Sequence, residues 1–443
     1  MKRLQAFVFE LKPNGAQQRA IRRFAGCCRF VFNKALALQR ANYESGGKFM
    51  GYLAMAKQLT EWRNGPETPW LKGAPVHPLQ HALKDLDRAY QNFFAKRTDF
   101  PRFKRKGTGG SFRYPDAKQF EVDESNSRLK LPKLGWIRYR NSRRILGSPK
   151  NITIRLSGGK CYASIQTERE VESPCPTATT AIGIDVGIAR FATFSDGAFI
   201  APLNSFKKHQ QRLARYQRRM SRKVRFSKNW QKARIKVHKV HTQIANARRD
   251  FLHKSTTTIS KKYALVCIED LKVTNMTSSS KGTREQHGHG VKQKSGLNRA
   301  ILDQGWAEFR RQLEYKMQWR GGELVAVPAN HTSQTCPRCE HVAPANRRTQ
   351  AQFQCVECGY SANADVVGAI NVLERGLALV SLSRGGLWPW SQDYDATSLG
   401  EAGTHRSDHQ EMAHAWRRRN LRRSRRGGRQ VVPGFLRFLT CAD

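Results

Sequence analysis

Two pairs of cysteines constrain the fold of this chain more than any other feature of its sequence. Cys336 and Cys339 form one C-x2-C pair, Cys355 and Cys358 form a second, and fifteen residues separate the pairs. Zinc is held tetrahedrally by four thiolates, and two tight turns of this spacing can supply them. Four cysteine ligands leave no coordination position open for chemistry. The sequence therefore predicts a structural zinc site, and four free buried thiols are the weaker alternative.

The remaining cysteines show neither metal-binding nor disulfide spacing (Cys27, Cys28, Cys161, Cys175, Cys267 and Cys441). This use of cysteine favours a reducing compartment over a disulfide framework. No apolar run approaches the ~18–20 residues that span a bilayer. We therefore expect a soluble cytoplasmic protein without a membrane segment.

The charge of the chain points to its partner. Lys and Arg number 79 against 34 Asp and Glu, a formal net charge of +45. Such an excess repels itself unless a polyanion neutralises it, so nucleic acid is the expected partner and a merely solvated surface is the alternative. Residues 205–254 hold 17 Lys and Arg and one acid, Asp250, at helical spacing. We expect this stretch to contact a nucleic-acid backbone.

Hydrophobic spacing indicates a mixed fold. Helical periodicity marks 17–43 and a second stretch that ends near Phe94, and β-structure is expected over 112–168. The clearest signal there is a hairpin, in which two alternating runs flank Gly158-Gly159. From Ala181 onward, short apolar strands alternate with helices, which is typical of an α/β fold.

Three carboxylates stand at the ends of apolar runs in a chain with few acids. Asp185 lies within Ile184-Asp185-Val186, Glu269 ends a strand-like run, and Asp365 precedes a helix. Each alone could be a turn residue, a strand-end acid or a helix cap. Together they can form a hard-oxygen site for Mg2+, and two such ions can hold the attacking water and the leaving oxygen of a phosphodiester. The expected chemistry is in-line hydrolysis.

Several motifs resemble the TnpB (OrfB) family over roughly residues 1–377. They are Gly183-Ile184-Asp185-Val186-Gly187, Ile268-Glu269-Asp270-Leu271, Gly296-Leu297-Asn298-Arg299, Thr332-Ser333 before the cysteines, and Asp365 with Gly368-Ala369-Ile370-Asn371. TnpB proteins are transposon-encoded RNA-guided DNA nucleases related to the type V CRISPR effectors. The sequence departs from the family at two positions, with Val367 in place of Asn and Glu340 in place of Gly. Neither departure removes a metal ligand or an acid, so the enzyme interpretation stands, and whether Val367 lowers activity through the geometry around Asp365 is left open.

The resemblance implies a multidomain α/β fold. It implies an RNase H-like (RuvC) nuclease domain at 179–330 and 361–377 with a zinc-finger insertion at 331–360. Before it would come a β-barrel wedge domain at 1–10 and 112–178, interrupted by a helical recognition domain at 11–111. We expect 378–443, where eight arginines crowd between Arg417 and Arg429, to be a basic, disordered tail.

The function implied is guided cleavage of DNA by an Mg2+-dependent endonuclease. Asp185, Glu269 and Asp365 match the family's catalytic acids and would hold two Mg2+ ions. An RNA from the transposon end would pair with the double-stranded DNA target, while the protein reads a short adjacent motif. The basic stretch 205–254 would contact this RNA or the RNA–DNA duplex, and we expect a monomer.

Three alternatives remain open. A guided DNA-binding repressor without nuclease activity is disfavoured by the intact acids. A type V CRISPR effector would be supported by a CRISPR array beside the gene. A DNA-strand transferase ranks last, because no Tyr or Ser stands in a recombinase-like setting. The loop 100–106, in which aromatic and basic residues alternate, either reaches DNA near the adjacent motif or packs a domain junction.

Overall fold

The computed structural model describes residues 1–106, 109–283 and 285–384 and has an α/β fold. Among these residues, no helix is both long and apolar enough to cross a bilayer. The last helix, α9 (Ala364–Arg384), includes the first seven residues of the expected tail. The rest of that tail, with the arginines at 417–429, lies outside the described residues.

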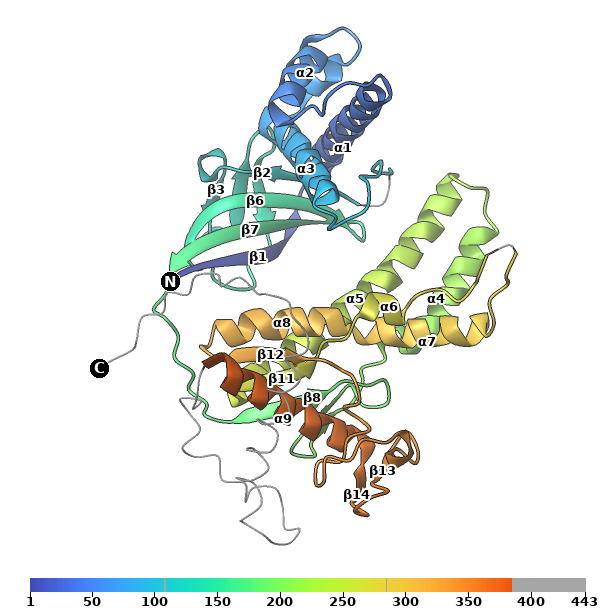
Figure 1. The fold of residues 1–443 in the computed structure, drawn as a ribbon. Coiled ribbons are helices and arrows are strands. Elements are labelled where there is room, and N and C mark those ends of the chain that lie inside the picture. Colours follow the sequence, from blue (N-terminus) through green and yellow to red (C-terminus); the bar gives the residue numbers. More distant parts are fainter. Residues whose placement is uncertain (107–108, 284, 385–443) are drawn as a thin grey trace. The chain divides into compact units, whose positions relative to one another are not determined.

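The first part of the chain forms a curved antiparallel sheet of seven strands in the order β2-β6-β7-β1-β5-β4-β3 (Figure 1). Its strands are β1 (Lys2–Lys12), β2 (Gly110–Tyr114), β3 (Glu121–Asp123), β4 (Arg128–Leu131), β5 (Gly135–Tyr139), β6 (Ser148–Ser157) and β7 (Lys160–Glu170). The predicted β6–β7 hairpin is confirmed, and both Gly158 and Gly159 adopt the positive φ of its turn. In the described part, no pairing joins β2 to β3, so closure into a barrel stays a prediction.

Three helices lie between β1 and β2: α1 (Gly15–Glu44), α2 (Tyr52–Asn64) and α3 (Val76–Phe94). A capping box starts α1, in which the Asn14 side chain accepts from the Gln17 amide and the Gln17 side chain accepts from the Asn14 amide. The buried faces of these helices and of the seven-stranded sheet form one continuous hydrophobic core. Because β1 extends to Lys12 and β2 starts at Gly110, the helical segment lies inside the expected boundaries 11–111.

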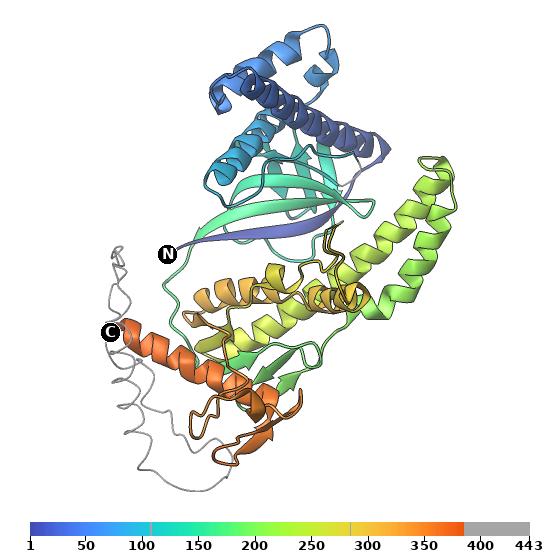
Figure 2. The same cartoon turned by 45° about the vertical axis from the view of Figure 1, so that its right-hand side comes forward.

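A second sheet of five strands follows in the order β10-β9-β8-β11-β12. Its strands are β8 (Ala181–Asp185), β9 (Ala192–Phe194), β10 (Phe199–Ile200), β11 (Leu265–Glu269) and β12 (Glu323–Val327). Strands β8, β11 and β12 are parallel, whereas β9 runs antiparallel to β8. Side chains alternate between the faces: Val266 and Ile268 pack with α5 (Lys228–Lys262) and α8 (Trp306–Gln318), whereas Leu265 and Cys267 pack with α9. The sheet is therefore the middle of three layers (Figure 2).

The basic stretch 205–254 is not one helix. It forms α4 (Ser205–Ser221) and the larger part of α5, which pack side by side as a hairpin (Figure 1). The helix restarts at Ser227, whose hydroxyl oxygen accepts a hydrogen bond from the Trp230 amide. Two shorter helices, α6 (Val273–Met276) and α7 (Val291–Gln304), lead to α8, and β13 (Gln352–Gln354) and β14 (Ser361–Asn363) pair just before α9.

Gly183 allows α9 to lie directly on strand β8. A Cβ at this position would stand 2.1 Å from the Ala369 carbonyl oxygen and 2.8 Å from the Leu373 Cβ. We expect Gly183→Ala to push α9 away and lower the free energy of unfolding by about 1–3 kcal/mol, the usual cost of overpacking. Chemical denaturation measures this change. Gly73→Ala, where an added Cβ meets nothing within 4 Å, is the control, and equal stability of the two variants would contradict the close approach.

Candidate functional site

Two of the three acids end neighbouring parallel strands. Ile184 of β8 is paired with Ile268 of β11, so Asp185 and Glu269 come next in the same register. Glu269 is two residues beyond Cys267, whose side chain faces α9, and Asp185 is two residues beyond Gly183, which lies against α9. Because alternate side chains share a face, both carboxylates point toward the α9 side of the sheet.

The third acid comes from α9 itself. Asp365 lies in the first turn of α9, where its backbone amide donates to the Asn363 side-chain oxygen at 3.1 Å. One turn further, Gly368 passes close to β8, since a Cβ there would stand 3.3 Å from Asp185 Oδ2. The same close packing of α9 on β8 that Gly183 permits therefore carries Asp365 toward the strand ends.

Electrostatics at this cluster reflect burial and mutual repulsion. Burial, followed by the charges of Glu269 and Asp365, raises the pKa of Asp185 to about 7, although Arg347 acts in the opposite direction. Burial also raises the pKa of Glu269. A divalent cation would neutralise the acidic charge around Asp185, since hard cations prefer oxygen ligands. Asp185 thus lies near enough to Glu269 and Asp365 for their charges to act on it, whereas within the described residues only the four cysteines form a group close enough together to hold a metal ion.

Three further residues support the cluster, and the sequence analysis assigned a role to none of them. The Thr332 hydroxyl donates to Glu269 Oε1 at 2.6 Å. The Asn371 amide of α9 donates to the carbonyl oxygens of Thr332 and Thr335 at 2.7 and 2.8 Å. Arg347 lowers the pKa of both Asp185 and Glu269. Thr332 and Asn371 belong to recognisable motifs, but Arg347 lies in the loop between the cysteine pairs, where no local pattern marks it.

The four predicted cysteines converge. Their sulfur atoms all lie within 4.8 Å of one another, with Cys336 Sγ 3.6 Å from Cys358 Sγ and Cys339 Sγ 3.5 Å from Cys355 Sγ. Zinc–sulfur bonds of about 2.3 Å place tetrahedral sulfurs roughly 3.8 Å apart, so the cluster fits zinc. Both cysteine turns close in the same way, with the amides of Glu340 and Gly359 donating to the carbonyls of Cys336 and Cys355.

The departure from the family at Glu340 has a structural consequence. Glu340 has φ 58° and Gly359, its counterpart in the second turn, has φ 72°. This left-handed conformation is natural for glycine and costs other residues about 1–2 kcal/mol. The first cysteine turn therefore holds a strained glutamate where glycine would be relaxed.

The cysteine module and α9 share a small core. Cys336, Phe353 and Cys355 pack in one buried cluster with Ala364 and Val367 of α9. Residues two apart on a helix are about 200° apart around its axis, so Val367 faces this core while Asp365 points elsewhere. The valine that replaces the usual asparagine thus joins the module to α9. Whether this replacement lowers activity stays open.

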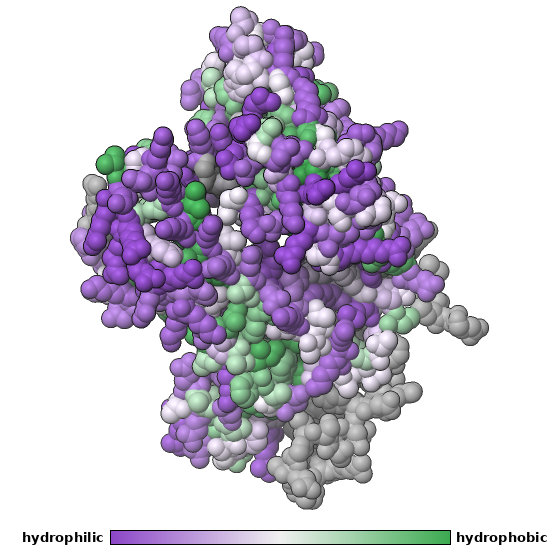
Figure 3. All heavy atoms as spheres, turned by 180° about the vertical axis from the view of Figure 1, so that it is seen from behind, coloured by the Kyte–Doolittle hydropathy of each residue, from purple (hydrophilic) through white to green (hydrophobic). Residues whose placement is uncertain are grey.

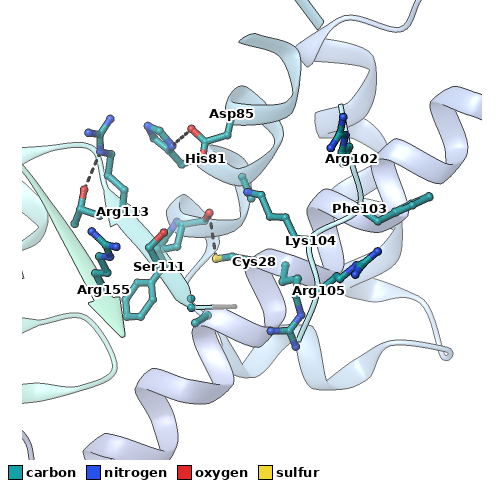
Figure 4. Close-up of a pocket in the computed structure, with 18 of the residues that line it drawn as sticks. Cys28, His81, Asp85, Arg102, Phe103, Lys104, Arg105, Ser111, Arg113 and Arg155 are labelled. Carbon is teal, nitrogen blue, oxygen red and sulfur yellow. Dashed lines mark hydrogen bonds and ion pairs between the residues drawn. The ribbon is translucent and has the colours of Figure 1, made fainter. Parts of the chain in front are cut away.

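A basic cavity of about 1040 Å3 opens between α1, α3, β2 and β6. It is lined by one acid, Asp85, and seven cations (Arg29, Arg40, Arg102, Lys104, Arg105, Arg113 and Arg155), several of which point into it in Figure 4. The loop 100–106 contributes to this wall while its aromatic part packs inward: Phe100 contacts Tyr90 at 5.5 Å between ring centroids. The aromatic part of the loop thus packs against α3 and its cations line the cavity, whereas contact with DNA stays a prediction.

Three protein-family models match segments of this chain. The OrfB_IS605 model, described as "Probable transposase", matches residues 164–280, a "Cas12f1-like, TNB domain" model matches 306–372, and a "Helix-turn-helix domain" model, HTH_OrfB_IS605, matches 1–48. In the structure, that last segment holds β1 and one long helix, α1.

Two relatives match along most of their length. The chain is 56% identical over 381 residues to "Putative RNA-guided DNA endonuclease InsQ" of Escherichia coli strain K12, covering 86% of this chain and 94% of that protein. It is 34% identical over 383 residues to a protein of Streptomyces pristinaespiralis with the same description, covering 84% and 90%. Among solved structures, a Cas12f1–sgRNA–target DNA complex is similar at a TM-score of 0.48 and 13% identity, covering 79% of this chain and 81% of that chain.

Proposed function

The chain belongs to the TnpB (OrfB) family, and from this premise we propose that it is an RNA-guided DNA endonuclease whose cleavage centre is formed by Asp185, Glu269 and Asp365. The observation that carries the proposal is the proximity of Glu269 and Asp365 to Asp185 at the ends of β8 and β11, on the face covered by α9. We assign 179–330 and 361–377 to a RuvC-like nuclease domain and 331–360 to a zinc-finger insertion.

The residues of the centre have separate tasks. The three carboxylates would hold Mg2+ through their oxygen atoms, and the bound ion would neutralise phosphodiester charge and activate water. The Thr332 hydroxyl donates a hydrogen bond to Oε1 of Glu269 and so fixes the orientation of this carboxylate. The positive charge of Arg347 favours the ionised forms of Asp185 and Glu269, which are the forms that bind a cation. The zinc module acts through structure, because its core holds the first turn of α9.

The partners follow from the charge and the family. We propose that a guide RNA from the transposon end and a double-stranded DNA target are held by the basic surfaces, and that the protein acts as a monomer. The cavity between the N-terminal helices and the seven-stranded sheet suits a phosphate backbone. The wedge (1–10 and 112–178) and recognition (11–111) assignments place this cavity at their junction. A guided repressor without nuclease activity and a type V CRISPR effector are the competing functions.

One experiment tests the guided function. The full chain is purified from cells that also express the DNA flanking its gene, and the co-purifying RNA is sequenced. We expect one dominant RNA from the transposon end and, with Mg2+, cleavage of a randomised-flank DNA library beside a short common motif. The same complex in EDTA is the control. Absence of bound RNA would overturn guided function, and guided binding without cleavage would favour the repressor.

A further inference from the structure

The tip of the α4–α5 hairpin, residues 219–236, takes no part in the proposed cleavage centre. The hairpin's own core consists of Leu213, Val237, Val240 and Ile244, with Met220 partly buried beside it. Beyond Met220 the two helices share no buried apolar side chain among the described residues. What the tip presents to solvent is therefore not explained by the packing of the hairpin.

The tip carries an aromatic pair, of which Phe226 is exposed and Trp230 is half-buried. Phe226 is 65% exposed and contacts Trp230 edge to face, with ring centroids 5.5 Å apart. Each ring also forms a cation–π contact. The Arg225 guanidinium lies 5.0 Å from the Phe226 ring centroid, and the Arg234 guanidinium lies 5.5 Å from the Trp230 ring centroid. Rings flanked by guanidinium groups are the usual platform on which unpaired bases stack.

The backbone holds Phe226 outward at a cost. The Ser227 amide donates to the Val224 carbonyl at 3.1 Å, which makes Phe226 the third residue of a tight turn, with φ 68°. Glycine or asparagine favours this position, and a bulky aromatic residue is strained there. The Gln231 side chain donates to the Phe226 carbonyl at 2.9 Å and secures the turn. Strain of this kind persists where it serves a function.

A basic groove lies along the same two helices, lined by neither Phe226 nor Trp230. It has a volume of about 470 Å3 and is lined by Tyr216, Asn229 and Ala233 together with five cations, Arg219, Arg222, Lys223, Lys232 and Lys236. Within the described residues none of these five cations forms a salt bridge. The side of the molecule that carries the hairpin is mostly hydrophilic, with a few hydrophobic patches (Figure 3). A groove without acids suits phosphates.

We propose that the tip binds an unpaired segment of RNA, with bases stacked on Phe226 and Trp230 and phosphates in the basic groove. A duplex would present only phosphates, because its bases are already stacked, so the rings select single strands. The choice of RNA over DNA rests on the proposed function, in which RNA is the resident partner and DNA a transient one. The exposed Phe226 ring is best covered by a resident partner.

The test uses the full chain and short oligonucleotides, so that it depends on neither a guide nor cleavage. Affinity is measured for a single-stranded RNA of about twelve nucleotides, the RNA duplex of the same sequence, and the matching single-stranded DNA. Phe226→Gly removes the ring and relaxes the turn, so the variant keeps its fold. Phe199→Ala removes another exposed phenylalanine with a stacked arginine, 4.5 Å from Arg190, and is the matched control.

We expect Phe226→Gly and Trp230→Ala each to weaken single-stranded RNA binding about tenfold, since stacking contributes this much per base. The affinity of both variants for duplex RNA should stay within about twofold of the wild type. Phe199→Ala should change neither the single-strand affinity nor the duplex affinity. The double variant Lys232→Gln/Lys236→Gln should lower the affinity for both single-stranded and duplex RNA and reduce the salt dependence of binding. Unchanged single-strand affinity, or equal losses for duplex and single strand, would refute stacking. A larger loss for DNA than for RNA would reassign the tip to a DNA strand. Failure of guided cleavage with these effects intact would overturn only the proposed function.

Discussion

Asp185→Asn is expected to abolish DNA cleavage while making the metal-free protein more stable. Removal of a metal-binding carboxylate costs several kcal/mol of transition-state stabilisation, so cleavage should fall at least about a thousandfold. The same carboxylate is costly to ionise when no cation is bound, because burial and the charges of Glu269 and Asp365 oppose its charge. Asparagine keeps the shape and removes that cost. Guide-RNA binding should not change, since the substitution leaves the basic surfaces intact.

The stability gained in Asp185→Asn should depend on pH. The pKa of Asp185 is raised from its ordinary value of 3.8 to about 7 in the folded chain. Its neutral form is therefore favoured by folding, and the wild-type stability that depends on this form is lost as pH rises from about 4 through 7. The unfolding temperature of Asp185→Asn should exceed that of the wild type by an amount that grows between pH 4 and pH 8.

Thermal unfolding in EDTA and in Mg2+ measures both parts of this expectation. Mg2+ should raise the unfolding temperature of the wild type and have little effect on the variant, because ligand binding stabilises only the form that binds. Asp250→Asn is the control, since Asp250 is an exposed acid that forms a salt bridge with Lys254. Cleavage by Asp185→Asn at the wild-type rate would refute the assignment of the site. An unfolding temperature of Asp185→Asn below that of the wild type at pH 8 would contradict the electrostatic explanation.

Cys355→Ser is expected to remove zinc and to disable cleavage from a distance. Structural zinc in small modules contributes about 10–16 kcal/mol, which is folding free energy of the module. Cys355 also packs in the core that contains Ala364 and Val367, so its loss should release the first turn of α9, which carries Asp365. We expect about one zinc per wild-type chain and almost none in the variant, with cleavage reduced at least about a hundredfold. RNA binding by the basic cavity and by the α4–α5 hairpin should remain.

Metal analysis and limited proteolysis check this expectation. The loop between the cysteine pairs, 340–354, should resist protease in the wild type and be cut in the variant. Cys175→Ser, at an exposed cysteine outside the cluster, should keep both zinc and cleavage. Zinc retained at the wild-type level in Cys355→Ser would refute the four-cysteine site. Cleavage at the wild-type rate without zinc would show that the catalytic centre does not depend on the zinc module.

Local patterns account for much of the fold. The Gly-Gly pair within alternating strands predicted the β6–β7 hairpin, because glycine alone accepts the φ values of that turn without cost. The spacing of the cysteines predicted their convergence for a similar reason, since each C-x2-C turn closes on itself. The basic stretch 205–254 was harder: its charge and periodicity continue through 222–227, and the break depends on a short turn and the cap at Ser227.

The sequence by itself determined which groups are present: four cysteines spaced for zinc, three acids at the ends of apolar runs, and a large cationic excess. Only the tertiary structure decided which of these groups meet. Asp185 and Glu269 become neighbours through parallel strand register, and Asp365 joins them because Gly183 lets α9 lie on the sheet. Thr332 and Arg347 reach the same acids from the cysteine module. Such contacts depend on packing between segments distant along the chain, and no local pattern encodes that packing.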